Sequence, residues 1–128
     1  MVRTTSRSTT GTVYGLYDPL SDRLVYVGAT TQRLSQRLNG HMAVPSPKVR
    51  EWIDVCRSLG VRPIIRPIHE NVPVEDLPRL ESEEIKANAH DHGLLNHHHG
   101  GKNSPKPEEV LTWLARYVWT DLKRTKNA

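Results

Sequence analysis

Two short segments rich in aromatic and β-branched residues, 13–17 and 24–27, stand on either side of the sequence DPLSD (residues 18–22). Aromatic and β-branched residues favour strands, and a run of Asp, Pro and Ser favours a turn. These segments therefore predict a β-hairpin. Segment 61–69 (VRPIIRPIH) is also expected to be a strand. Its two prolines cannot donate hydrogen bonds to a neighbouring strand, so we expect it at a sheet edge.

Four other segments have the periodicity of helices. The first follows two threonines at positions 30 and 31, either of which could cap it. The second follows Ser46 and Pro47, the third spans about residues 74–90, and the fourth begins near residues 104–105. The apolar face of the first helix consists of Leu34, Leu38 and Met42, and that of the second of Val49, Trp52, Ile53 and Cys56. The third has Leu77 and Ile85 on this face, and the fourth has Val110, Trp113, Leu114, Tyr117, Val118 and Leu122.

These elements predict an α/β fold in which helices flank a small three-stranded sheet, mixed or antiparallel, with an added C-terminal helix. A length of 128 residues is sufficient for one domain. We expect a flexible basic leader over residues 1–10, a folded domain over 11–97, and a loop and C-terminal helix packed on that domain over 98–128.

The chain has 18 Lys and Arg residues against 14 Asp and Glu residues, a net charge of +4 with histidine neutral. A basic chain favours a polyanionic partner because clustered cations release counterions from phosphates, although many basic proteins bind no nucleic acid. The single cysteine, Cys56, excludes an internal disulfide and fits a reducing compartment. Since no apolar run reaches the roughly 18 residues of a membrane span, we expect a cytoplasmic protein that does not enter a membrane.

The first predicted helix carries a row of basic side chains. Arg33, Arg37 and His41 are four residues apart, so they lie on one side of the helix beside its apolar face. Such a row is usually a solvated shoulder. A partly buried imidazole at His41 would instead titrate near neutral pH, where it could accept a proton.

The third predicted helix has a carboxylate on its apolar face. Leu77, Glu81 and Ile85 are spaced at i, i+4 and i+8, so Glu81 occupies a position where a packed helix ordinarily has Leu. Glu83 is about 200° away and is free to face solvent. A buried carboxylate is costly unless it is paired or bound to a metal. Glu81 is therefore either the partner of an arginine such as Arg37 or a metal ligand.

The order of these residues resembles the GIY-YIG nuclease superfamily. That family has a first-strand triplet ending in Tyr, a spacer, a Tyr-Ile/Val-Gly triplet, an Arg and often a His on the next helix, a helical Glu and a late Asn. The sequences TVYGLYDPLSDRLVYVGATTQRLSQRLNGH and LESEEIKANAHDHGLLN are similar to its two halves. The resemblance runs from about Thr12 to Asn96 and identifies residues 11–97 as a GIY-YIG-like nuclease domain.

Two tyrosines compete for the first triplet. The sequence GLY (15–17) matches it better in residue type, whereas TVY (12–14) leaves eleven residues before Tyr26, a spacing typical of the family. Tyr14 and Tyr17 point to opposite faces of a strand, so the two alignments place different phenols in the site. We expect Tyr14.

The resemblance implies a metal-dependent DNA endonuclease. Tyr14 would activate the attacking water with His41 as the proton acceptor, and Tyr26 would orient water or phosphate. Arg37 would stabilise charge on the scissile phosphate, and Glu81 would hold one Mg²⁺ or Mn²⁺ ion. An unperturbed phenol has a pKa of about 10, so a tyrosine acts as a base near pH 7 only beside a cation, a metal or a histidine.

Arg33, Asn96 and Lys102 are the candidate DNA-binding residues. Asn96 is a positioning residue by resemblance, although it could equally hold the Leu-Leu-Asn turn. The histidines at 90, 92 and 97–99 do not suggest zinc, because the chain has one cysteine and positions i and i+2 do not share a helix face. Phosphate contact through the loop that contains Lys102 fits them better.

Two other functions stay open from the sequence. The chain could be a DNA-binding module of the same fold without turnover, or a structural or protein-interaction domain in which Glu81 is a paired core carboxylate. A long, specific DNA site would require a homodimer or a partner protein, because no separate recognition domain is evident.

Overall fold

The structure is a computed structural model that describes residues 10–88, 94–97 and 107–119. At its centre is a three-stranded antiparallel sheet in the order β2-β1-β3, made of β1 (Thr10–Tyr17), β2 (Leu24–Thr30) and β3 (Ile64–Pro73). The predicted hairpin of β1 and β2 is confirmed. The strand expected over 61–69 is observed at Ile64–Pro73, so Pro67 lies within it and Pro63 precedes it. β3 lies at an edge of the sheet, as predicted, where a proline that cannot donate a ladder hydrogen bond is tolerated.

Helical elements flank this sheet and are α2 (Leu34–Ala43), α3 (Arg50–Ser58), the 3₁₀ turn η1 (Val74–Asp76), α4 (Leu77–Ala87), the 3₁₀ turn η2 (Leu95–His97), α5 (Pro107–Trp113) and the π-helical turn η3 (Leu114–Val118). The α/β fold class with an added C-terminal helix is thus confirmed. Within the described ranges, no helix is long and apolar enough to cross a membrane.

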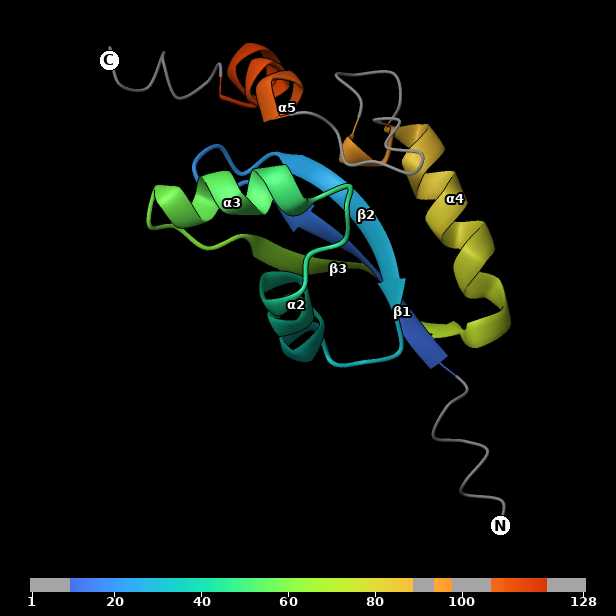
Figure 1. Cartoon of the computed structure of the whole chain (residues 1–128). Coiled ribbons are helices and arrows are strands. Elements are labelled where there is room, and N and C mark those ends of the chain that lie inside the picture. The colour runs from blue at the N-terminus through green and yellow to red at the C-terminus, as the bar shows by residue number, and fades with distance from the viewer. Residues whose placement is uncertain (1–9, 89–93, 98–106, 120–128) are drawn as a thin grey trace.

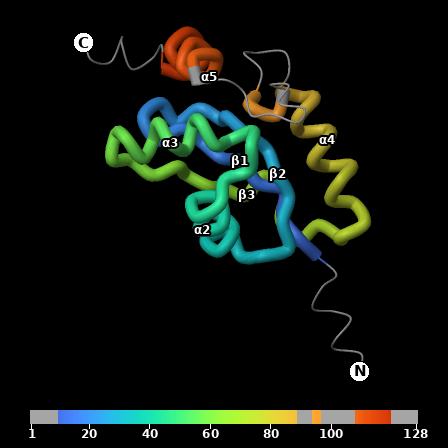
Figure 2. Tube along the Cα trace, in the orientation of Figure 1, coloured from blue at the N-terminus to red at the C-terminus, as the bar shows by residue number. Residues whose placement is uncertain are grey.

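The two faces of the sheet pack against different helices (Figure 1). On one face, Tyr14 and Leu16 join a buried cluster with residues of α2, α3, α5 and η3, including Trp52. On the other face, Val13 and Val27 pack with Leu77 of α4. In Figure 2, α4 runs beside β2, and α5 lies against α3. Side chains alternate along β1, so Tyr14 and Val13 belong to different layers.

The predicted helix starts differ from the structure in three places. The helix expected to follow Ser46 and Pro47 begins at Arg50, with Val49 at its N-cap and no side-chain cap. The Thr30 hydroxyl accepts a hydrogen bond from the Gln32 amide at 3.0 Å, and α2 begins later, with Arg33 at its N-cap and no side-chain cap. The expected helix at 74–90 begins with a 3₁₀ turn, and α4 starts at Leu77 with a proline in its first turn. α4 ends at Ala87, a few residues before the expected end at about residue 90, and the predicted restart at 104–105 lies outside the described residues.

A buried carboxylate connects the hairpin turn with two helical segments. Asp18 is 1% exposed, and it accepts hydrogen bonds from the backbone amides of its own turn. It also accepts the indole N–H groups of Trp52 on α3 at 3.0 Å and of Trp119 at 3.2 Å. Trp119 follows η3 and donates its amide to Leu114 at 2.7 Å. The C-terminal helical segment is therefore held on the core by charge-assisted hydrogen bonds as well as by apolar packing.

A candidate active site around Tyr14

Tyr14 on β1 lies opposite Gly28 on β2 in the antiparallel register. A Cβ atom added at Gly28 would be 2.5 Å from Tyr14 Oη, which is too close for atoms that are not bonded. The phenol therefore occupies the space that any other residue at position 28 would fill. In this position the Tyr14 side chain is 1% exposed.

Two residues from consecutive turns of α2 contact the Tyr14 hydroxyl. Tyr14 Oη and His41 Nε2 are 2.8 Å apart, and Arg37 Nε donates a hydrogen bond to Oη at 3.2 Å. The predicted basic row is thus only partly a solvated shoulder. Arg33 is exposed at the start of the helix, whereas His41 near its end is buried.

Neighbouring segments hold α2 in this position from outside the cluster. Arg57 of α3 donates a hydrogen bond to the Met42 carbonyl, next to His41. Arg62, which precedes β3, donates to Asn39 Oδ1 at 2.7 Å. These contacts connect the last turns of α2 to α3 and to the segment that precedes β3.

Burial controls the protonation of the Tyr14–His41 pair. It raises the pKa of Tyr14 to about 12, against the opposing effect of Arg37. Burial also lowers the pKa of His41 to about 4, and the charge of Arg37 acts in the same direction. His41 therefore titrates well below the neutral range expected from the sequence. In the tautomer that carries its proton on Nδ1, the neutral imidazole of His41 can accept the phenol proton at Nε2.

Tyr26 lies beside the same imidazole. The Tyr26 and His41 rings meet edge to face with their centroids 5.9 Å apart, and pairing with Leu16 puts Tyr26 on the same sheet face as Tyr14. Burial raises the pKa of Tyr26, and the charge of Glu81 raises it further. Two phenols, an imidazole and a guanidinium thus form one cluster.

Glu81 on α4 is electrostatically coupled to this cluster, since its charge raises the pKa values of both Tyr14 and Tyr26. The carboxylate is half-buried, and burial raises its own pKa. It makes no hydrogen bond or ion pair with any residue that the structure describes, so pairing with Arg37 is not what holds it. Glu83 is exposed and pairs with Arg79 at 3.2 Å, as expected for the solvent side of the helix.

A half-buried carboxylate without a partner fits a divalent cation. Among the described residues, no three His, Cys, Asp or Glu side chains gather as a metal site. A metal ion at Glu81 would therefore have one protein carboxylate and would fill its other positions with water and substrate oxygens. Mg²⁺ in particular is commonly bound in this way.

Asn96 and the two other candidate DNA-binding residues have different surroundings. The Asn96 amide accepts a hydrogen bond from the Val27 N–H at 2.9 Å and donates to the Val27 carbonyl at 2.8 Å. It therefore fixes β2 between Tyr26 and Gly28 as a positioning residue. Arg33 lines a polar cleft at the start of α2. Lys102 lies outside the described residues, as do the histidines at 90, 92, 98 and 99.

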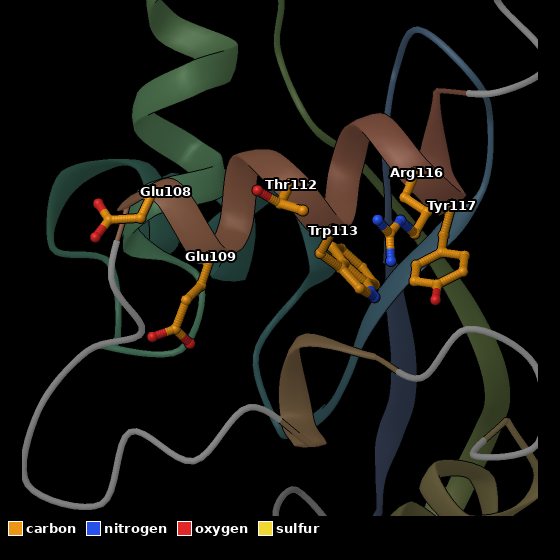
Figure 3. Close-up of a pocket in the computed structure, with 6 residues that line it drawn as sticks. All are labelled: Glu108, Glu109, Thr112, Trp113, Arg116 and Tyr117. Atoms are coloured by element: carbon orange, nitrogen blue, oxygen red, sulfur yellow. The ribbon is translucent and has the colours of Figure 1, made fainter.

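A separate hollow of about 370 Å³ lies on the C-terminal helical segment and shares no lining residue with the Tyr14 cluster (Figure 3). Trp113, Arg116 and Tyr117 project from one side of that segment. Trp113 is also part of the buried core, as its helical spacing predicted. This hollow is therefore not an extension of the candidate active site.

Comparison of the chain with protein-family models, with curated proteins and with solved structures finds no match.

Replacing Gly28 with alanine tests whether the Tyr14 phenol needs the space left by the missing side chain at position 28. We expect Gly28→Ala to lower the free energy of unfolding by about 1–3 kcal/mol, because the new methyl group overlaps Oη in a packed core. Urea unfolding measures this loss. The matched control is Gly40→Ala, whose Cβ would meet only Arg37 Nη1 at 3.6 Å. It should raise stability by about 0.5–1 kcal/mol, as in an ordinary helix. Similar effects of the two substitutions would contradict this account of Gly28.

The low pKa of His41 predicts loss of stability in acid. The folded pKa of about 4 lies below the value of 6.5 for an unperturbed histidine, so the unfolded chain binds a proton that the folded chain excludes. The stabilisation is complete above pH 6.5 and is lost as the pH falls to about 4, by about 3 kcal/mol in total. Unfolding free energies at several pH values should show a shallower decline for His41→Gln than for the wild type. Equal slopes would mean that His41 is not held neutral.

Proposed function

We propose that this protein is a metal-dependent DNA endonuclease of the GIY-YIG type that hydrolyses phosphodiester bonds. One observation carries the proposal: the buried Tyr14 hydroxyl lies between a neutral imidazole at 2.8 Å and a guanidinium at 3.2 Å. A tyrosine that only packs in a core needs one hydrogen-bond partner. The combination of a proton acceptor and a cation suits a phenol that gives up its proton during a reaction.

The proposed reaction exchanges one P–O bond for another and passes a proton from the attacking water, through Tyr14, to His41. Tyr14 Oη takes a proton from the attacking water while its own proton passes to His41 Nε2, and the water oxygen bonds to phosphorus. The bond from phosphorus to the leaving oxygen then breaks, and that oxygen takes a proton from solvent. With pKa values of about 12 for Tyr14 and about 4 for His41, the resting phenolate is scarce. Both proton transfers must therefore accompany the attack of water.

Arg37 and Tyr26 supply charge stabilisation and orientation. The Arg37 guanidinium lies beside Oη, where it stabilises developing phenolate character and can reach a phosphate held against the cluster. Tyr26, edge to face with His41, offers a hydroxyl that can orient water or phosphate. A Mg²⁺ or Mn²⁺ ion bound by Glu81 would supply positive charge for the leaving oxygen. The net charge of +4 and the exposed Arg33 favour a polyanionic substrate.

The proposal is tested on supercoiled plasmid with purified protein and Mg²⁺ or Mn²⁺. Cleavage by the wild type should fall by about 10²-fold or more in Tyr14→Phe, the range for loss of a general base, after correction for the folded fraction. Tyr17→Phe is the matched control and should cleave normally. Its ring lies 4.7 Å from the guanidinium of Arg66, which pairs with Asp22, so it belongs to a different group of contacts.

Other outcomes separate the rival functions. Salt-dependent DNA binding without cleavage by the wild type, with either ion, would favour a binding module. Absence of DNA binding at moderate salt would favour a structural domain. Loss of cleavage in Tyr17→Phe with retention in Tyr14→Phe would overturn the role of Tyr14.

A further inference from the structure

A polar cleft of about 340 Å³ opens at the start of β1 and is lined by none of the residues of the Tyr14 cluster. Three segments meet there: the first residues of β1, the link from β2 to α2, and the last part of β3. Residues that line it include Thr12, Thr31, Gln32, Arg33, Glu70 and Asn71.

A β-bulge in β3 places two neighbouring side chains in this cleft. Gly11 pairs with Val72 and Val13 pairs with His69, so two residues of β3, Glu70 and Asn71, stand opposite Thr12 alone. Asn71 has a φ of 56°, in the left-handed region that asparagine tolerates better than most residues. Successive side chains of a regular strand point to opposite faces. Because of the bulge, both Glu70 and Asn71 line one cleft.

Two of the residues that line the cleft, Thr12 and Arg33, are close in sequence to Tyr14 and Arg37 of the cluster. Thr12 pairs with Thr30, two residues along the hairpin from the Tyr14–Gly28 pair and on the same face, a step of about 7 Å along the strand. Arg33 precedes Arg37 by one helical turn, about 6 Å along α2. A DNA strand with its scissile phosphate at Arg37 would therefore bring an adjacent nucleotide to the cleft, with Arg33 beside a neighbouring phosphate.

The chemistry of the lining favours a base over a phosphate. The Glu70 carboxylate repels a phosphate but accepts a hydrogen bond from an amino group. Carboxamides such as those of Gln32 and Asn71 are suited to adenine, and a glutamate is suited to the amino group of cytosine. None of the described residues that line the cleft is aromatic, so it offers hydrogen bonds in place of a stacking platform.

We propose that this cleft reads the base next to the cleaved bond and prefers a base with an exocyclic amino group, which donates to Glu70. This inference rests on the proposed DNA substrate but not on turnover. It gives the domain a sequence preference without a separate recognition domain.

Two ligand pairs that differ in one group test the inference. In dCMP and dUMP, and likewise in dAMP and dIMP, an amino group is exchanged for a carbonyl oxygen. Binding is measured without metal by NMR titration of backbone amides. The amino-bearing nucleotide should bind about 5-fold tighter or more, with shift changes at Gln32, Glu70 and Asn71. Glu70→Gln should abolish the preference, because a carboxamide can both donate and accept. Glu75→Gln removes an exposed charge outside the cleft and should retain it.

The outcomes distinguish this inference from the proposed nuclease activity. Equal binding within both ligand pairs, shift changes away from the cleft, or a preference that survives Glu70→Gln would each overturn the subsite. Plasmid cleavage by the wild type would show in parallel whether the catalytic proposal stands. A base preference without cleavage would support the proposed subsite and contradict the proposed nuclease activity.

Discussion

The Tyr14 hydroxyl reaches its partners because Gly28, across the hairpin, has no side chain in its way. Because the phenol fills that space, any side chain at position 28 of β2 would clash with it. A shift of β2 would move both Tyr26 and Gly28. Asn96 prevents such a shift by bonding both backbone groups of Val27 between them. The β1–β2 register, the asparagine and the glycine thus act together to place one hydroxyl against α2.

Burial of this hydroxyl then determines what the cluster can do. It keeps the phenol protonated and the imidazole of His41 neutral at pH 7. The pair is therefore uncharged before the reaction, and the phenol proton can move to the imidazole during it. Glu81 is the exception, since it is half-buried and unpaired among the described residues. A half-buried carboxylate without a partner is unfavourable in the protein alone. A bound cation would remove that cost, which is the physical basis for the proposed metal requirement.

Local patterns were enough to predict much of this arrangement. The prolines of β3 indicated an edge strand, the four-residue spacing put Arg37 and His41 on one side of α2, and the apolar row singled out Glu81. Features that depend on contacts between distant segments could not be predicted. Asp18 was identified as a turn residue, but its two indole partners are 34 and 101 residues away in the sequence. The irregular register near Leu16 and the bulge at Asn71 decide which side chains face each other, and neither follows from alternation.

The most direct test of the central claim is to locate a divalent ion by the paramagnetic broadening of backbone amide resonances during titration with Mn²⁺. This readout needs neither DNA nor turnover. The account predicts broadening centred on Glu81 and extending to Tyr14 and Tyr26 in the wild type. It should persist in Glu83→Gln and disappear in Glu81→Gln, which should remain at least as stable to heat because an unpaired buried charge is removed. Unchanged broadening in Glu81→Gln, or a large drop in its melting temperature with no change in Mn²⁺ binding, would contradict the account.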